Sequence, residues 1–589
     1  MYFKLKKRNA HPLQGTAMSV NAEVARILYE IGELLTIKED RFRSRAFLMA
    51  AQRVESLTED VRRIRERGEL LEIPSVGKSI AVIIEEVLDT GGSSQLEDLR
   101  ESLPHGVRDL MELEGIGPKT ALRLHNELGI VSIDSLEEAI KAGKLRGLKG
   151  FGVRTEENIL KSIEVYRGRQ ERFLLGGILP VIDQIVEYMK EPDSVIEVEP
   201  AGSGRRRKET IGDLDILVSS IRPEEVADWF VSMPRVDRVI SKGTTRSTIV
   251  VGARLQVDLR VVPPESYGAA LQYFTGSKEH NIKLRTIAVK KGYKLNEYGL
   301  FDRDTDERIA GETEGEIYEI LGMKYIEPEL REDRGEIEAA IEDRLPKLID
   351  LDEVKGDLHV HTKWSDGSAS IEEMAEKSRG MGLEYLAICD HSKSLGIARG
   401  LDEVRLREQM AEIDMLNERL DGFSVLKGIE CDIKADGSLD LSDSVLRDLD
   451  FVVASVHSGF RADERQMTKR IISAIHNDYV SAIGHPTGRL IQKRRPYALT
   501  IDEVFEAAVS QGVMMEINAF PDRLDLSDVN SRAAMERGVR MSIGTDAHTP
   551  NQLEYLSLGV TVARRGWLGF ENVVNALSAE ELLRSISRD

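Results

Sequence analysis

The chain has 589 residues, which is too long for one hydrophobic core and predicts several domains. Hydrophobic residues make up 41% of it, no apolar run is long enough to cross a membrane, and two cysteines cannot form a disulfide framework, so we expect a globular, cytoplasmic protein. The net charge of −21 argues against a uniformly basic nucleic-acid-binding surface, but the acidic surplus lies beyond residue 170 and local basic clusters remain.

A repeated element marks residues 18–170, where predicted helices alternate with glycine turns; its three copies are 71–81, 113–121 and 148–154. Each copy is a helix, a Gly-hydrophobic-Gly turn (Ser75 replaces the first glycine in the first copy) and a second helix. Glycine lets the backbone approach a phosphate, and the following helix offers unpaired N–H groups. One copy could equally be a glycine C-cap, whereas three favour DNA backbone binding. The residues predicted to contact DNA are Gly77, Lys78, Gly115, Gly117, Lys119, Gly150 and Gly152.

Residues 171–265 are predicted to be rich in strands: 194–200, 213–219, and a hairpin of 248–251 and 255–262 hinged at Gly252. Side chains two apart share a face of a strand, so Asp213 and Asp215 point the same way, and Asp258 could join them from a later strand. Three carboxylates on one face suit Mg²⁺, and two such ions can activate a 3′-hydroxyl and stabilise leaving pyrophosphate.

Upstream of these carboxylates, Gly202 and Ser203 precede an arginine run that includes Arg206, and Gly212 opens the Asp-x-Asp motif. A small turn, a hydroxyl and guanidinium groups can bind a triphosphate. An isolated Asp-x-Asp is usually a turn or a surface pair, but the full combination predicts a nucleotidyl-transfer site.

From residue 354 onward, strands that end in His or Asp alternate with amphipathic helices, which predicts an α/β barrel. Strand C-termini of such a barrel converge on one rim, so ligands distant in sequence can meet there. Six His and three carboxylates suit Zn²⁺ or Mn²⁺, with room for three ions that activate water for phosphoester hydrolysis. The predicted ligands are His359, His361, Asp366, His391, Glu430, His457, His485, Asp546 and His548.

Over about residues 20–330 the chain resembles the family X DNA polymerases, in Ala201-Gly202-Ser203, Asp213-Leu214-Asp215, Val257-Asp258-Leu259-Arg260, Tyr273-Phe274-Thr275-Gly276-Ser277 and Asn296-Glu297-Tyr298. The resemblance implies that the three aspartates are catalytic and hold two Mg²⁺ or Mn²⁺ ions. It implies a nucleotide site in which Ser203 and Arg206 contact the triphosphate, Tyr273 and Phe274 lie near the sugar, and Asn281 and Arg285 face the base pair and template. Gly202, Gly212 and Gly276 complete that site.

Two positions depart from that family. Members with deoxyribose-phosphate lyase activity use a lysine on the second helix of the first hairpin, where an ungapped count from Gly77 places Ile83, and Lys78 lies in the turn. Lyase activity by that route is therefore not expected. Gln256 is neutral where a basic residue often meets the primer.

Residues 354–575 resemble a PHP (polymerase and histidinol phosphatase) domain, with all nine metal positions filled. The combined architecture resembles bacterial and archaeal DNA polymerase X, which implies Mn²⁺-dependent 3′→5′ exonuclease and 3′-phosphatase activity, with apurinic-site endonuclease activity also known in the family. Arg489 and Lys493 to Arg495 could guide a DNA strand or form a solvated loop, and these alternatives are equally weighted.

The predicted fold is multidomain α/β, with a helix-hairpin-helix N-terminal region, a nucleotidyltransferase palm of mixed sheet, a thumb and a distorted TIM-like (β/α)7 barrel. The expected segments are a tail (1–17, with Met18 an alternative start), a DNA-end-binding domain (18–100), a fingers-like domain (101–170), the palm (171–265), the thumb (266–330), a linker with a charged helix (331–353), the PHP domain (354–575) and a C-terminal tail (576–589).

We expect a monomeric DNA repair polymerase that takes gapped, nicked or primer-template DNA and dNTPs, without a membrane partner. The family resemblance also allows a monovalent cation at the helix-hairpin-helix turns. The alternatives are a polymerase with an inert, structural PHP domain, a non-catalytic DNA-end scaffold, and a histidinol-phosphate phosphatase that would leave the first 330 residues without a role.

Overall fold

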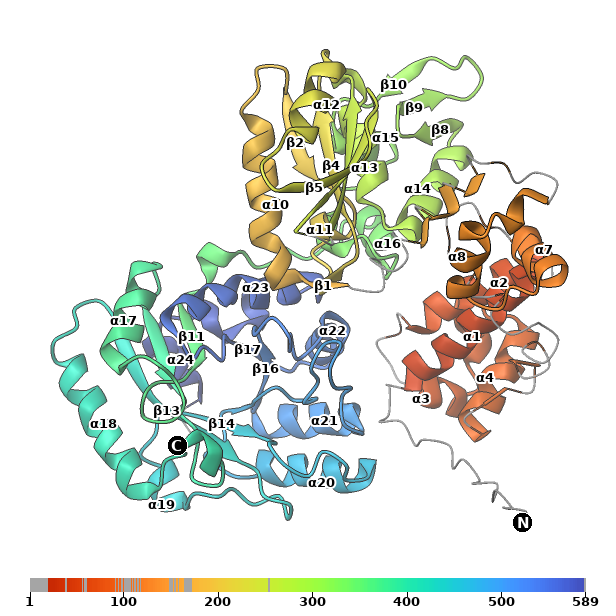
Figure 1. Cartoon of the computed structure of the whole chain (residues 1–589). Coiled ribbons are helices and arrows are strands. Elements are labelled where there is room, and N and C mark those ends of the chain that lie inside the picture. Colours follow the sequence, from red (N-terminus) through yellow and green to blue (C-terminus); the bar gives the residue numbers. More distant parts are fainter. Residues whose placement is uncertain are drawn as a thin grey trace, which may run out of the picture.

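A computed structural model describes residues 20–37, 40–55, 57, 61–90, 118–147, 172–252 and 255–586, with single positions and short stretches within 92–116 and 152–163. Figure 1 shows three lobes, which we name after the predicted segments: the helical domain (18–170), the palm (171–265) with the thumb (266–330), and the barrel (354–575). None of the described helices is both long and apolar enough to cross a membrane.

The helical domain is built on α1 (Val20–Ile37), whose apolar residues recur every three or four positions and form one buried face. This face packs on α2 (Arg41–Glu55) and α4 (Lys78–Thr90) in a common hydrophobic core. The other helices of the domain are α3 (Val61–Glu66), η1 (Leu70–Glu72), α7 (Pro118–Leu128), α8 (Ile133–Lys141) and η2 (Lys144–Gly147).

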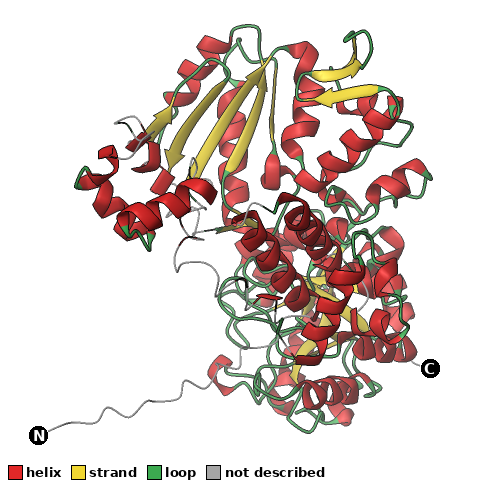
Figure 2. Ribbon diagram, turned by 90° about the vertical axis from the view of Figure 1, so that its right-hand side faces the viewer, coloured by secondary structure: helices red, strands yellow, loops and turns green. Residues whose placement is uncertain are grey.

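The palm is a five-stranded sheet in the order β2-β4-β7-β6-β5, with β4 and β7 parallel and the other neighbours antiparallel. Figure 2, seen from the side of the helical domain, shows this sheet with helices along it. The predicted hairpin is confirmed, because β6 and β7 pair across Gly252. The palm elements are β1 (Phe173–Leu174), α10 (Leu175–Lys190), β2 (Glu197–Pro200), α11 (Gly202–Arg205), β3 (Thr210–Ile211), β4 (Leu214–Ser219), α12 (Pro223–Val231), β5 (Val236–Ser241), β6 (Arg246–Val251), β7 (Leu255–Val262) and η3 (Pro264–Ser266).

The thumb packs a helical layer against a three-stranded antiparallel sheet. A Cβ atom at Gly268 would lie 2.3 Å from the Thr313 Cα, so only glycine lets these two segments approach so closely. The thumb elements are α13 (Tyr267–Thr275), α14 (Lys278–Lys290), β8 (Tyr293–Asn296), β9 (Gly299–Asp302), β10 (Arg308–Ala310), α15 (Glu314–Ile320) and η4 (Pro328–Leu330).

The segment expected to be a charged helical linker is instead largely packed. Its helix α16 covers only Glu336–Ile341, and the side chains of Arg331 and Glu336 are fully buried. Arg331 pairs with Glu314 at 2.5 Å, and Glu336 lies 2.7 Å from His280. These charges looked solvated in sequence because their partners lie on other elements of the thumb.

The barrel is a seven-stranded parallel sheet in which sequence order and spatial order coincide, from β11 to β17. A parallel bridge between Val360 and Ala547 brings the first and last strands together, so the sheet is nearly closed. With this barrel, the helical N-terminus and the thumb, the predicted fold class is confirmed. The strands of the barrel are β11 (Gly356–Val360), β12 (Tyr385–Ile388), β13 (Ser424–Asp432), β14 (Phe451–Ser455), β15 (Ala482–Ile483), β16 (Met514–Asn518) and β17 (Met541–Gly544).

Helices surround the barrel, and their apolar faces share a core with its strands and with the palm. The longer ones are α17 (Ile371–Gly380), α18 (Glu403–Asn417), α20 (Glu464–Ile475), α21 (Ile501–Gln511), α22 (Asp528–Glu536), α23 (Leu556–Arg565) and α24 (Ala579–Ile586). The short ones are η5 (Leu351–Glu353), η6 (Gly396–Ala398), α19 (Asp443–Leu446), η7 (Pro550–Tyr555), η8 (Phe570–Asn572) and η9 (Val574–Ala576).

Candidate active sites

The palm brings two of the predicted aspartates directly side by side. In the parallel pair of β4 and β7, Asp215 is the register partner of Asp258, and Asp213 immediately precedes β4. Leu214 and Ile216 are buried on the opposite side, as the alternation in sequence predicts. Asp213 and Asp215 are half-buried, so this face of the sheet remains open to a substrate.

Three polar side chains position the Asp258 carboxylate. The Thr248 hydroxyl donates to its Oδ1 at 2.5 Å, Gln256 Nε2 donates to its Oδ2 at 2.9 Å, and Arg246 Nη2 lies 3.5 Å from Oδ1. Sequence reasoning missed Arg246 and Thr248. Thr248 was detectable, because it lies on the predicted hairpin and is the antiparallel register partner of Asp258, whereas Arg246 precedes the predicted strand 248–251.

The Asp215 carboxyl lies where a negative charge is disfavoured. Burial, followed by the charges of Asp213 and Asp258, raises its pKa to about 7. A Cβ at Gly202, which has a positive φ of 56°, would lie 2.3 Å from Asp215 Oδ2. Only glycine therefore lets the backbone approach this carboxylate, and crowded acids of this kind fit a bound divalent cation.

Arg205 and Arg206 are held by acids on other segments. Arg206 Nε lies 3.1 Å from Glu332, and its Nη1 donates to the Thr275 carbonyl at 2.5 Å. Arg205 forms two hydrogen bonds with Glu314, at 2.7 and 3.0 Å. The predicted triphosphate ligand Arg206 thus lies at the palm–thumb junction, three residues after Ser203 in α11.

The other predicted nucleotide residues form a small network at the start of the thumb. Asn281 is buried; its Nδ2 donates to the Tyr273 carbonyl at 2.7 Å and its Oδ1 accepts from Gln272 at 2.6 Å. Arg285 Nε donates to the Asn281 carbonyl at 3.2 Å, and the rings of Tyr273 and Phe274 meet edge to face at 5.2 Å. A Cβ at Gly276 would be 3.1 Å from Arg206 Nη1, and one at Gly212 would be 3.2 Å from Arg172 Nη1.

The barrel brings all nine predicted metal-binding side chains to its C-terminal rim. Glu430 is at their centre, because its two carboxylate oxygens face different histidines. Its Oε2 lies within 2.7–3.7 Å of a nitrogen of His391, His359 and His361. Its Oε1 lies 2.9 Å from His485 Nε2 and 3.2 Å from His457 Nε2.

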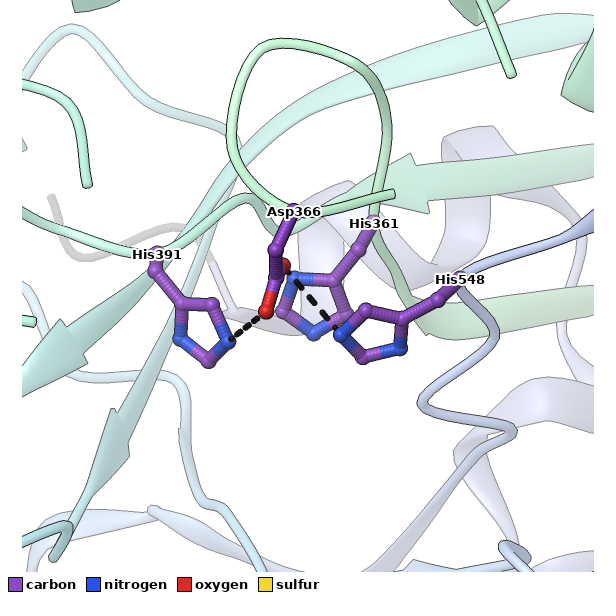
Figure 3. A group of neighbouring side chains, drawn as sticks. All are labelled: His361, Asp366, His391 and His548. Atoms are coloured by element: carbon purple, nitrogen blue, oxygen red, sulfur yellow. Dashed lines mark ion pairs between the residues drawn. The ribbon is translucent and has the colours of Figure 1, made fainter. Parts of the chain in front are cut away.

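Three groups of these residues each place their ligand atoms within 4.8 Å of one another. One group, His361, Asp366, His391 and His548, is drawn in Figure 3, where the side chains point toward a common centre. The others are His359, His361 and Asp546, and His391, Glu430 and His457. Within the residues that the structure describes, no group of this tightness includes the palm aspartates.

Several atoms of the rim are buried without a hydrogen-bond partner, which fits a site built for cations. They are His359 Nε2, both ring nitrogens of His361, His391 Nδ1, Glu430 Oε2 and His485 Nδ1. Burial, with the neighbouring His548 and His391, lowers the pKa of His361 to about 3, so its imidazole is neutral and can act as a ligand. Imidazole nitrogens with carboxylate oxygens suit Zn²⁺ or Mn²⁺.

A second layer of acids orients these histidines and was missed in sequence. Glu516 Oε1 lies 2.6 Å from His359 Nδ1, and Asp432 Oδ1 lies 2.6 Å from His457 Nδ1. Such contacts fix the ring so that its other nitrogen faces the metal. Asp432 was detectable, because it lies two residues after Glu430 on the same strand face.

The proposed DNA-binding turns are only partly described. Gly77 precedes α4, Lys78 is its exposed first residue, and Gly152 precedes a short helical stretch. Ile83 is buried in the helical core, as suits an apolar residue rather than a nucleophile. Gly115, Gly117, Gly150, the side chain of Lys119 and the predicted tail 1–17 with Met18 lie outside the described residues.

The basic loop after His485 has structural partners. Arg489 Nη2 lies 2.8 Å from Glu209 of the palm, and Lys493 Nζ lies 2.8 Å from Asp522. The Arg494 guanidinium stacks 4.2 Å from the Phe460 ring. Arg489 therefore joins the barrel to the palm, whereas Lys493 and Arg494 are held within the barrel, and the role of this loop as a strand guide stays a prediction.

Family models match four parts of the chain: a helix-hairpin-helix domain at 19–93, a SAM-like helix-hairpin-helix tandem at 107–164, a DNA polymerase beta thumb at 270–332 and a PHP domain at 357–520. The palm, whose aspartates were predicted from their motif and from the family X resemblance, lies between the second and third matches.

Three curated proteins show how far the similarity extends. The chain is 39% identical over 570 residues to the DNA polymerase/3'-5' exonuclease PolX of Bacillus subtilis (strain 168), covering 96% of this chain and 99% of that one. It is 34% identical over 203 residues to a probable phosphatase of Thermoanaerobacter sp. (strain X514), covering 33% and 78%. With DNA polymerase lambda of Rattus norvegicus it shares 24% identity over 355 residues, covering 55% and 58%.

Proposed function

This chain belongs to the family of the bacterial DNA polymerase/3'-5' exonuclease PolX, and on that premise we propose that it fills short DNA gaps during base excision repair and processes 3′ ends at its barrel. The observation that carries the polymerase half is the direct pairing of Asp215 with Asp258 on parallel strands. The observation that carries the hydrolase half is the convergence of nine metal-binding side chains around Glu430.

At the palm, Asp213, Asp215 and Asp258 would hold two Mg²⁺ or Mn²⁺ ions. Those ions would supply charge stabilisation for a 3′-hydroxyl nucleophile and a leaving pyrophosphate. Thr248, Gln256 and Arg246 keep Asp258 oriented toward them, so its carboxylate need not reorganise during the reaction. Ser203 and Arg206 would bind the triphosphate, and Tyr273, Phe274, Asn281 and Arg285 would contact the sugar, base pair and template.

At the barrel rim, the nine residues would hold Mn²⁺ or Zn²⁺, with places for three ions. Bound there, such ions would lower the pKa of water for attack on a phosphoester. Glu516 and Asp432 hold the imidazoles in the orientation that leaves their other nitrogens free to bind. The substrates would be 3′-terminal nucleotides, which a 3′→5′ exonuclease removes, and 3′-phosphate ends. Apurinic sites are a further candidate.

We also propose gapped, nicked or primer-template DNA and dNTPs as partners of a monomeric, cytoplasmic enzyme. The helix-hairpin-helix turns at Gly77, Gly115 and Gly150 would bind the DNA backbone, with a monovalent cation as an optional ligand. Buried Ile83 gives no support to Schiff-base lyase chemistry on this helix.

A single gapped duplex, labelled at the primer 5′ end, tests both halves. We expect extension with dNTPs in Mg²⁺ and shortening without dNTPs in Mn²⁺. Asp258→Ala should abolish extension and preserve shortening, whereas the double variant His359→Ala, Asp546→Ala should do the reverse.

Two outcomes would contradict these assignments. Shortening that survives in the double barrel variant would make the PHP domain a structural appendage. The absence of any incorporation by the unmodified chain, in every divalent metal tried, would leave a non-catalytic DNA-end scaffold.

A further inference from the structure

A cavity of about 790 Å³ lies where the palm, the thumb, the barrel and the helical domain meet. The palm lines it with residues 206–210, the thumb with 277–279, and the barrel with two loops that include Thr487 and Leu524. Its volume falls within the range of pockets that enclose small organic ligands, and it can therefore hold one or two nucleotides of a strand.

The cavity lining carries a surplus of positive charge. Seven of its residues are Lys or Arg and four are Asp or Glu. Three of these acids are already engaged by arginines: Glu332 with Arg206 and Arg565 at 3.1 and 3.2 Å, Asp528 with Arg334 and Arg565 at 3.0 and 2.7 Å, and Glu209 with Arg489 at 2.8 Å. The fourth acid, Glu279, is not enough to balance the other three cations, Arg207, Lys208 and Lys278.

Two cations of the lining, Arg207 and Lys278, are left for a ligand. Neither Arg207 nor Lys278 has a carboxylate within ion-pair distance in the part of the chain that the structure describes, and Lys208 Nζ is 3.9 Å from Glu332. The helix α14 also begins at this cavity, with Lys278 as its first residue, and its N-cap Ser277 accepts a hydrogen bond from the His280 N–H. Free N–H groups and positive dipole ends at helix starts attract phosphate.

The lining of this cavity is close along the chain to residues of both candidate active sites. On the palm side, Arg206 to Lys208 follow α11, whose Gly202 backbone abuts Asp215. On the barrel side, Thr487 is two residues after His485, and Leu524 follows Arg523, whose Nε is 3.4 Å from Asp546. The walls of the cavity thus reach within a few residues of both carboxylate centres.

We propose, building on the function proposed above, that this cavity binds the phosphodiester backbone of a single-stranded 3′ segment as it passes between the palm and the barrel rim. Arg207 and Lys208 neutralise its phosphates, and the first turn of α14 adds N–H donors. Neither residue belongs to the predicted nucleotide or metal sites. Their role is to hold the strand during transfer.

Binding is measured in EDTA, so that it does not depend on either catalytic activity. We expect the double variant Arg207→Ser, Lys208→Ser to bind a fluorescent oligo-dT about 10- to 100-fold more weakly, and its slope of log K against log salt to fall by about 1.4, since each single-strand phosphate contact contributes about 0.7. The matched control is Lys290→Ser, Lys291→Ser, which removes the same charge from exposed positions at the far end of α14. Equal slopes in the two variants would overturn the assignment.

A second measurement places the strand in the cavity. Both native cysteines are buried, so Asn530→Cys introduces one accessible thiol in the lining. Oligo-dT should slow its alkylation several-fold and leave an exposed Ser510→Cys control unchanged. Protection by pyrophosphate but not by oligo-dT would make the ligand a free phosphate and refute the strand path, and no protection by either would refute a phosphate site. With the binding confirmed, variants of Arg207 and Lys208 should trim and then extend mismatched primers more slowly than the unmodified chain does.

Discussion

Asp215, one of the proposed catalytic carboxylates, lies where its negative charge destabilises the folded protein. Its pKa is raised from 3.8 to about 7 by burial and by Asp213 and Asp258. An acid with a raised pKa favours the folded state only while it is protonated. In the metal-free protein, stability contributed at this site is therefore greatest at low pH and is lost as the pH rises from about 4 to about 7.

Asp215→Asn should stabilise the metal-free protein at pH 8 by about 1–4 kcal/mol, since each pKa unit corresponds to about 1.4 kcal/mol. At pH 4 the effect should nearly vanish, because both side chains are then neutral. Thermal unfolding in EDTA at the two pH values measures this difference. If Asp215→Asn left the melting temperature at pH 8 unchanged or lowered it, the ionised Asp215 carboxylate would not destabilise the folded protein.

A side chain's place in a site can be predicted from sequence when it depends on residues nearby in the chain. Asp213 and Asp215 share a face by strand alternation alone, and the barrel ligands follow apolar strands that must end at one rim. The approach of Glu516 to His359 depends on how strands far apart in sequence are placed in the barrel. A single acid or base inside a strand gives no sequence signal of its partner.

At the scale of elements, the start of α15 depends on a buried charge. Glu314 is buried, and although burial acts to raise its pKa, Arg331 and Arg205 lower it to about 2. The stability that this carboxylate contributes is present above its unfolded pKa of about 4.5 and is lost as the pH falls toward about 2. Arg331 itself is fully buried and has no second carboxylate partner in the described region.

Glu314→Gln should destabilise the thumb by about 3–5 kcal/mol, because it leaves two buried guanidinium groups without their acid. The thermal transition at pH 7 should fall by several degrees, and the gap to wild type should narrow in acid. Glu319→Gln, an exposed position on the same helix, serves as the control and should change little. Equal effects of the two substitutions would contradict a buried network.

Elements with their own periodicity could be predicted from sequence, and those defined by distant partners could not. The β6–β7 hairpin and the barrel strands are short apolar runs bounded by turn residues. Segment 331–353 has the charge pattern of a solvated helix, yet Arg331 and Glu336 are buried against the thumb. Its polarity suggested solvent because ion pairs between distant segments leave no local pattern.

At the scale of the whole molecule, Arg565 of the barrel joins the two catalytic halves. Its Nη1 donates to the Arg206 carbonyl at 2.5 Å and lies 3.2 Å from Glu332, and its Nη2 contacts Asp528 at 2.7 Å. Arg206, the proposed triphosphate ligand, shares Glu332 with it. The palm and the barrel are therefore coupled through one buried charge cluster.

Arg565→Met should loosen this junction, because Glu332 and Asp528 each lose a buried cation. We expect faster proteolytic cleavage near residues 331–353 and a larger radius of gyration in solution scattering. Arg537→Met removes an arginine that pairs with Asp502 inside the barrel, and it should leave both quantities unchanged. A radius unchanged in both variants would show that other contacts hold the halves together.

The same charge cluster bears on how this protein can be inherited. Arg565 and Asp528 are encoded more than 190 residues downstream of Glu332 and Arg206. If either pair is removed, the charges of the other pair stay buried without their partners, which is costly. Recombination that exchanged the barrel alone would separate these partners and produce a chimaera with a destabilised junction. The two catalytic halves are thus expected to pass between genomes as one unit, with substitutions on one side matched by changes on the other.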